Sequence, residues 1–106
     1  MNELRYAAML VVLVLCPAWV SAQTDAASLF KSNCALCHAQ DGSGNSPSGK
    51  ALKAKDLRLP ETQTKSDADI AEVISKGRNK MPSFGQKLKP EQIQQLVAYI
   101  HQLAKK

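Results

Sequence analysis

The feature that most constrains this chain is a C-x-x-C-H motif, formed by Cys34, Cys37 and His38. This spacing is typical of covalent haem attachment. Two thiolates three residues apart lie on one turn of a helix, where they can add across the two vinyl groups of a haem and leave thioethers. The adjacent His38 can then donate an imidazole nitrogen to the iron as an axial ligand. The motif therefore predicts one covalently bound haem c with its iron.

Three other interpretations use the same residues. A redox-active C-x-x-C pair would follow a strand in a βαβ unit, whereas the flanking residues 25–33 favour a helix. A zinc site needs about four ligands, and the other histidine, His101, is far along the chain with no second cysteine pair. A disulfide within the motif would be strained and would leave His38 without a role. Haem attachment is the interpretation that uses all three residues.

Residues 1–22 have the three-part form of a secretory signal peptide. A short polar head precedes an apolar run over residues 7–15, and a small-residue cleavage site ends at Ala22. Cleavage there leaves residues 23–106 as a single domain. The alternative is an uncleaved anchor, but the run is shorter than the about 20 residues that span a bilayer, and Pro17 interrupts it.

Cleavage of the signal peptide would change the composition of the chain that folds. Of the three cysteines, two remain, both in the haem motif, so a further disulfide is impossible; of the three methionines, Met81 remains. The net charge stays at +5, because the segment removed carries one Arg and one Glu. A domain this small has a modest core, to which a haem would add. Haem attachment outside the cytoplasm predicts a periplasmic protein, and we expect no nucleic-acid partner.

The apolar periodicity is helical and no segment alternates as a strand would, so the predicted fold class is all-α. The three expected helices span about residues 25–37, 67–76 and 90–104. Thr24 is the expected cap of the first, and Ser66 caps the second, which Gly77 ends. Pro90 favours the first position of the third helix, whereas Lys89 is a poor cap for it. The intervening residues are expected to form long loops, with one short helical turn at Ala51–Ala54.

Met81 is the predicted second axial ligand. An iron held by one histidine needs a sixth ligand if it is to transfer electrons without binding other molecules. Met81 is followed by Pro82, which favours an extended backbone that can project the thioether toward a cofactor. A lone methionine often only fills a gap in a core, and His101 is a further candidate, although it lies near the terminus. Ligation by His38 and Met81 predicts a low-spin, six-coordinate iron suited to one-electron transfer.

The sequence resembles the class I c-type cytochromes, particularly the small bacterial single-haem proteins, over nearly the whole domain. The segments that carry the resemblance are Ala26 with Phe30, Cys34–His38, Asn79–Phe84 and Leu96–Ile100. The resemblance implies a cytochrome c fold, in which three main helices and loops wrap around one covalently bound haem. It also implies a close crossing of the first and last helices, in which Ala26 and Phe30 contact Leu96 and Tyr99.

The resemblance has further implications for the haem surroundings. In this family a carbonyl in a proline loop orients the axial histidine, and Pro47 is the nearest match. The stretch from His38 to Met81 is short for the family, which leaves one haem edge open. The candidate donors to the haem propionates are Lys50, Lys55, Arg58, Arg78 and Asn79. Arg78 and Asn79 are the preferred hypothesis, because both lie next to Met81.

The predicted function is soluble one-electron transport in an extracytoplasmic respiratory or related chain, by a monomer that is not an enzyme. No nucleophile, acid–base pair or phosphate loop lies beside the motif. The lysines near the haem-bearing segments are Lys31, Lys80, Lys87 and Lys89. They would steer the protein toward acidic faces of redox partners, and they fit a merely solvated surface equally well. A haem enzyme or gas sensor, and a fixed subunit of a redox complex, are the alternatives.

Overall fold

A computed structural model describes residues 22–106, and within them the fold is helical without strands. The helices are α1 (Ala22–Asn33), α2 (Ala35–His38), α3 (Pro47–Leu52), α4 (Pro60–Gln63), α5 (Asp67–Lys76) and α6 (Pro90–Leu103). The all-α prediction is confirmed. None of these helices has the length and apolar character needed to cross a bilayer. The predicted signal peptide lies outside the described residues apart from Ala22, so the cleavage site stays a prediction.

The expected first helix is divided in two. α1 ends at Asn33, whose side-chain amide donates to the Leu29 carbonyl at 2.9 Å, and α2 begins at Ala35. Side-chain hydrogen bonds of this kind compete with the regular helix. Cys34 lies at the break, with φ −118° and ψ −35°. The predicted Thr24 cap is wrong, because α1 already begins at Ala22.

Two short helices, α3 and α4, lie in the stretch where mostly loop was expected. Both begin with a proline, at the position where the missing N–H costs nothing. The Ser46 hydroxyl caps α3 by accepting a hydrogen bond from the Gly49 N–H at 2.9 Å. The predicted turn at Ala51–Ala54 therefore overlaps only the end of α3, because the helix starts four residues earlier.

The other two main helices follow their local sequence signals. α5 has the predicted bounds; the Ser66 hydroxyl accepts from the Asp69 N–H at 3.1 Å, and Gly77 ends the helix at φ 74°. α6 begins at Pro90 as predicted and ends at Leu103. The weak cap expected at Lys89 is compensated, because its backbone N–H donates to the Gln92 side chain at 2.8 Å.

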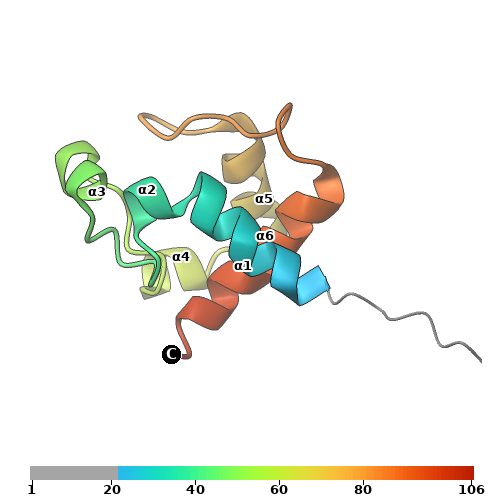
Figure 1. Ribbon diagram of the computed structural model, residues 1–106, viewed down its shortest axis with the longest axis horizontal. Helices are drawn as coiled ribbons and strands as arrows, with labels where there is room; N and C mark the ends of the chain where they lie inside the picture. Colours follow the sequence, from blue (N-terminus) through green and yellow to red (C-terminus); the bar gives the residue numbers. More distant parts are fainter. Residues whose placement is uncertain (1–21) are drawn as a thin grey trace, which may run out of the picture.

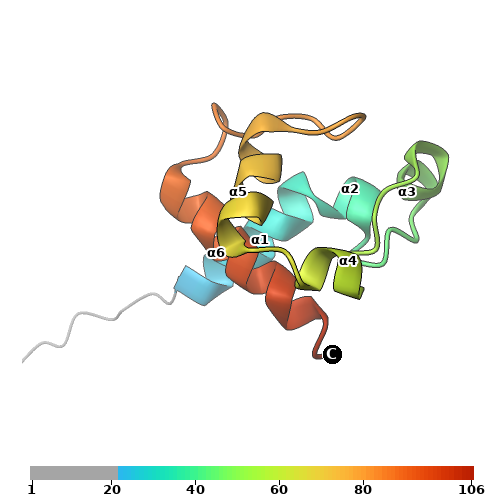
Figure 2. The same ribbon diagram turned by 180° about the vertical axis from the view of Figure 1, so that it is seen from behind.

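The core lies where α1 and α5 pack against α6 (Figures 1 and 2). Phe30 of α1 and Leu96 of α6 are 1% and 0% exposed, and the rings of Phe30 and Tyr99 lie 5.1 Å apart. The predicted contact between the first and last helices is therefore confirmed at Phe30. Ala26 is buried as well. In both views α2, α3 and α4 lie to one side of this crossing, and the loop after α5 extends over the same side.

Candidate functional site

The two motif cysteines lie one turn apart at α2. The N–H groups of Cys37 and His38 both donate to the Cys34 carbonyl, at 3.2 and 2.9 Å. Both thiols are half-buried and unpaired with each other. Burial, with a smaller contribution from the Cys37 charge, raises the pKa of the Cys34 thiol to about 11. A redox-active pair needs a lowered thiol pKa, so the environment of Cys34 argues against that interpretation.

His38 is held in one tautomer by the backbone. Its Nδ1 lies 3.0 Å from the Lys55 carbonyl oxygen. Because a carbonyl only accepts, Nδ1 must carry the proton, and Nε2 of the neutral ring keeps its lone pair. This arrangement is typical of a metal-binding imidazole.

The carbonyl that orients His38 was expected from Pro47, and that prediction is wrong. Pro47 occupies the first turn of α3, whereas the acceptor comes from Lys55, beyond the end of that helix. The sequence carries no signal for this contact, because every residue has the same backbone carbonyl.

Ser46 joins the haem motif to α3. Its hydroxyl lies 2.7 Å from the Leu36 carbonyl and 3.1 Å from the Cys37 carbonyl, to which it donates, while it accepts from the Gly49 N–H. Gly49 is buried, and a Cβ there would collide with the Cys37 carbonyl. Sequence reasoning missed Ser46, although a serine before a proline is a helix-cap signal.

Met81 lies in a turn that two backbone hydrogen bonds close. Its N–H donates to the Arg78 carbonyl at 2.9 Å, and the Arg78 N–H donates back to the Met81 carbonyl at 3.1 Å. Asn79 takes the left-handed conformation within this turn, at φ 54°. The Phe84 N–H ties the loop to α5 by donating to the Ile74 carbonyl at 2.9 Å. Met81 itself is half-buried and packs against the core.

The other candidate ligand, His101, is engaged elsewhere. Its Nδ1 lies 3.0 Å from Gln63 Oε1 and its Nε2 lies 2.9 Å from Asp67 Oδ1. With a partner on each ring nitrogen, His101 is a poor candidate for an iron ligand. Within residues 22–106 no three His, Cys, Asp or Glu side chains are grouped so that they could hold a metal ion.

Two of the candidate propionate donors have acidic partners. Arg58 binds Asp56 at 3.0 Å and lies 3.7 Å from Asp41, and Lys55 lies 3.1 Å from Glu61. Hydrogen bonds from the Arg58 side chain are the main cause that holds the pKa of Asp56 below its usual value. Arg78 and Asn79 are exposed on the turn of Met81. Because the side chains of Lys55 and Arg58 are already paired with carboxylates, Arg78 and Asn79 are the better candidates for propionate donors.

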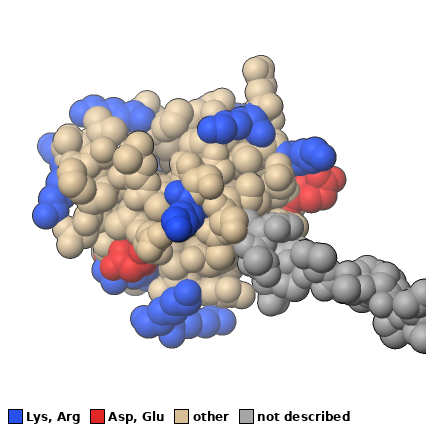
Figure 3. All heavy atoms as spheres, viewed as in Figure 1, with Lys and Arg blue, Asp and Glu red and all other residues tan. Residues whose placement is uncertain are grey.

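The basic side chains do not form one patch on the face drawn in Figure 3, where Lys and Arg stand at separate points, some of them beside Asp or Glu. The four lysines named for partner steering are all exposed: Lys31, Lys80, Lys87 and Lys89. Lys87 places its Nζ 5.9 Å from the centre of the Phe84 ring. On the face that Figure 3 draws, the basic side chains are therefore dispersed.

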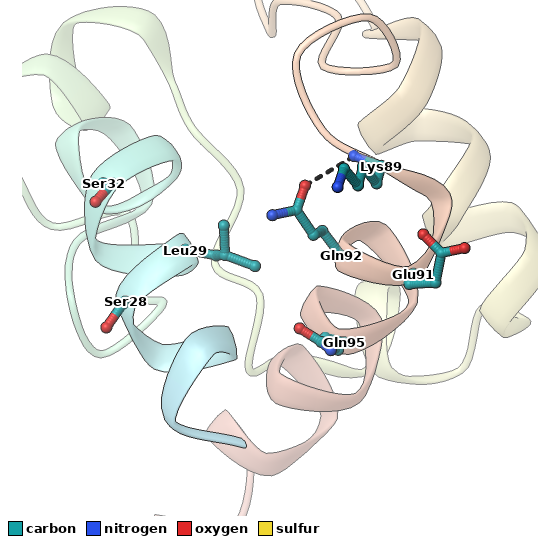
Figure 4. A pocket seen from close by; sticks show the side chains of 7 residues that line it. All are labelled: Ser28, Leu29, Ser32, Lys89, Glu91, Gln92 and Gln95. Atoms are coloured by element: carbon teal, nitrogen blue, oxygen red, sulfur yellow. Dashed lines mark hydrogen bonds between the residues drawn. The ribbon is translucent and has the colours of Figure 1, made fainter. Parts of the chain in front are cut away.

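A hollow of about 390 Å³ lies between α1 and the start of α6 (Figure 4). The residues that line it are Ser28, Leu29, Ser32, Lys89, Glu91, Gln92 and Gln95. Leu29 points from α1 toward Gln92, whose side chain is held by the Lys89 backbone. None of the predicted haem-binding residues lines this hollow.

The donor set of the motif and the Met81 turn fits a haem of the c type. Two free thiols one turn apart can form the two thioethers, and the His38 tautomer leaves Nε2 available to an iron. A methionine sulfur is carried by a separate, firmly closed turn. These are the covalent and axial donors that cytochromes c use.

Comparisons with known proteins agree with this chemistry. The family described as "Cytochrome C oxidase, cbb3-type, subunit III" matches residues 21–100. Cytochrome c6 of Nostoc sp. is 39% identical over 84 residues, which cover 79% of this chain and 73% of that protein. Cytochrome c6 of Limnospira maxima is 35% identical over 82 residues, covering 76% of this chain and 91% of that one.

Two further matches extend the comparison. The cbb3-type cytochrome c oxidase subunit FixP of Azorhizobium caulinodans is 33% identical over 88 residues, which cover 82% of this chain but only 29% of FixP. Among solved structures, the KustC0563 c-type cytochrome has a TM-score of 0.65 and 32% identity, covering 74% of this chain and 95% of that one. The chain therefore belongs to the class I monohaem c-type cytochromes, electron carriers whose cofactor is haem c with its iron.

Proposed function

We propose that this protein is a soluble, monomeric one-electron carrier with a single haem c, and that it is not an enzyme. Cys34 and Cys37 would hold the haem through two thioethers, His38 would bind the iron through Nε2, and Met81 would bind it through sulfur. Ligation of this kind supplies a low-spin iron whose potential is raised relative to two-histidine ligation.

The observation that carries the proposal is the hydrogen bond from His38 Nδ1 to the Lys55 carbonyl. It fixes the ring in the tautomer that an axial ligand requires, at the residue where C-x-x-C-H places the ligand. A histidine that merely packed in a small core would have no need of a fixed Nδ1 donor beside two unpaired thiols. Met81 supports the same assignment, because its turn is closed by two hydrogen bonds and its side chain faces the core.

We also propose that residues 1–22 direct export and are cleaved, so that residues 23–106 act in the periplasm as part of an extracytoplasmic electron-transfer chain. The redox partners would present acidic docking faces to Lys31, Lys80, Lys87 and Lys89. Because such steering is electrostatic, the rate of electron transfer should fall as salt is raised.

Absorption spectroscopy of the exported, haem-loaded protein tests the ligand assignment. The oxidised protein should show the weak sulfur-to-iron band near about 695 nm, and the reduced protein should be low-spin. Met81→Leu keeps the volume of the side chain but removes the sulfur, so it should abolish the band. Ser83→Ala, an exposed change in the same loop, should retain it. Cys34→Ala and Cys37→Ala should each remove one thioether, which intact-mass and acid-extraction measurements detect.

The opposite result has a definite meaning. A wild-type protein that carries haem but lacks the band, is high-spin and binds carbon monoxide readily when reduced would not have Met81 on its iron. The function would then be ligand binding or catalysis.

A second candidate is a fixed subunit of a terminal oxidase complex. The observation in its favour is the match of residues 21–100 to the family described as subunit III of cbb3-type cytochrome c oxidase. Fractionation of cells that produce the chain separates the two: a carrier appears in the soluble extract, whereas a subunit sediments and co-purifies with the other subunits of the oxidase. We favour the carrier, because the identity to cytochrome c6 of Nostoc sp. is 39%, compared with 33% to FixP.

A further inference from the structure

The side chain of Gln63, at the end of α4, connects this helix to the segment before it and to α6. Its Nε2 lies 2.7 Å from the Leu57 carbonyl and 3.0 Å from the Ile100 carbonyl, and it donates to both. These two bonds use both amide protons, and neither carbonyl could pair with the amide oxygen instead. The orientation of the Gln63 amide is therefore fixed, with Oε1 directed away from the two carbonyls.

His101 holds the other end of that amide. Gln63 Oε1 can only accept, so His101 Nδ1, 3.0 Å away, is the donor. The second ring nitrogen, Nε2, lies 2.9 Å from the carboxylate of Asp67 at the start of α5. The imidazole of His101 on α6 therefore contacts both Gln63 and Asp67 of α5. The His101 side chain is 30% exposed.

The Leu57 end of the same network leads to the proposed axial histidine. The Leu57 N–H donates to the Gly42 carbonyl at 2.7 Å, and its own carbonyl accepts from Gln63, so the Leu57 peptide is held from both sides. Leu57 is buried and follows Lys55 by only two residues. The Lys55 carbonyl is the acceptor for His38 Nδ1.

The ion pair between this segment and α4 is a weaker anchor. Lys55 pairs with Glu61 of α4 at 3.1 Å, but both side chains are about two-thirds exposed, at 68% and 66%. Exposed pairs of this kind contribute little. Gln63 is half-buried and binds the backbone itself, so it is the stronger link between residues 55–57 and α6.

We propose that Gln63 is a positioning residue for His38. By binding the Leu57 and Ile100 carbonyls together, it holds the Lys55 carbonyl at hydrogen-bond distance from Nδ1, and His101 fixes the Gln63 amide in the orientation that this requires. The inference rests on the proposed role of His38 as an axial ligand. A hydrogen bond from Nδ1 makes the imidazole a more basic ligand, which stabilises the ferric iron. Loosening that bond should therefore raise the midpoint potential.

The test compares Gln63→Leu with Gln94→Leu, the same change at an exposed position of α6. Both variants are studied as haem-loaded proteins, by the exchange rate of the His38 Nδ1 proton in NMR spectra of the reduced state and by the midpoint potential. In Gln63→Leu the proton should exchange about tenfold faster and the potential should rise. Gln94→Leu should match the wild type in both. His101→Ala should change both quantities in the direction of Gln63→Leu, by less.

The two proposals fail in different ways. Absence of the sulfur-to-iron band in the wild type overturns the ligand assignment, whereas the His38 proton exchange rate does not depend on that band. If the band is present and Gln63→Leu has the exchange rate and potential of Gln94→Leu, the positioning role is overturned. If Gln63→Leu does not accumulate, His101→Ala is the deciding variant. A His38 proton exchange rate and a midpoint potential equal to those of the wild type in His101→Ala would also contradict the inference.

Discussion

Replacing Gly77 with alanine should loosen the Met81 side of the site and leave the His38 side intact. Gly77 has φ 74° and ψ 171°, a region that residues with a Cβ rarely enter. A Cβ built there would lie 2.6 Å from the Met81 carbonyl oxygen. The next nearest atoms, in Pro82 and Ser83, are backbone atoms as well, at 2.9 Å. Because no rotamer change relieves such contacts, the whole turn would have to move.

The magnitude follows from these two effects. A non-glycine residue in this backbone region costs about 1–3 kcal/mol, and forcing a packed neighbour to move costs about 1–3 kcal/mol. One movement of the turn relieves part of both, so we expect the free energy of unfolding to fall by about 2–4 kcal/mol. In a domain of this size that lowers Tm by about 10 °C or more.

Gly44→Ala is the matched control. Gly44 has φ 76°, and a Cβ there would lie 2.7 Å from the Ala54 carbonyl oxygen, so the strain and the collision are of the same kind. Its N–H, however, donates to the His38 carbonyl at 2.7 Å, on the other side of the site. Urea unfolding measures the stability of both variants, and the thermal bleaching of the band near about 695 nm reports on the sulfur ligand.

Both variants should lose similar stability, but only Gly77→Ala should bleach the band well below the temperature at which the protein unfolds. The reasoning is refuted if bleaching and unfolding stay together in Gly77→Ala as they do in Gly44→Ala, because Met81 would then not depend on its turn. Wild-type stability in Gly77→Ala would refute the strain argument itself.

Two further changes test the packing of α3 and the acid sensitivity of the fold. Gly49→Ala should lower stability by about 2 kcal/mol and reduce the yield of haem-loaded protein, because its Cβ would collide with the Cys37 carbonyl; Ser48→Ala should do neither, as urea unfolding and haem staining would show. Hydrogen bonds from Arg58 keep the pKa of Asp56 lowered in the folded state, so the pair stabilises the fold above the unfolded-state value of about 3.9 and ceases to do so as the pH falls through the lowered value. Asp56→Asn should therefore cost less than about 1 kcal/mol at pH 7 and nothing in strong acid, in unfolding measured across a pH series.

The parts of the fold that the sequence predicted are those with short-range causes. Ser66 and Gly77 define α5 because a hydroxyl cap and a glycine terminator act within one turn of the helix. Pro90 marks the start of α6 for the same reason. The contact of Phe30 with Tyr99 came from the resemblance to a family, and the ring distance of 5.1 Å agrees with it.

The features that sequence reasoning missed depend on contacts between distant backbone atoms. The His38 acceptor is a carbonyl 17 residues away, and nothing in the identity of Lys55 distinguishes its carbonyl from that of Pro47. Gln63 reaches the Ile100 carbonyl across 37 residues, and a glutamine after a proline-led turn suggests only solvent exposure. The break at Cys34 was missed because helical periodicity continues through it, while the Asn33 side chain competes locally with the helix.

The two proposed axial ligands are held by different kinds of structure, and this difference predicts how each responds to change. Met81 lies in a local turn of four residues that closes on itself through Arg78, so mutations on the His38 side of the site should leave it in place. His38 depends on a chain of hydrogen bonds through Lys55 and Gln63 that ends on α6. Fraying of the end of α6 should therefore alter the histidine bond, and with it the potential, before it displaces the sulfur. A carrier built in this way can change its potential without losing its sixth ligand.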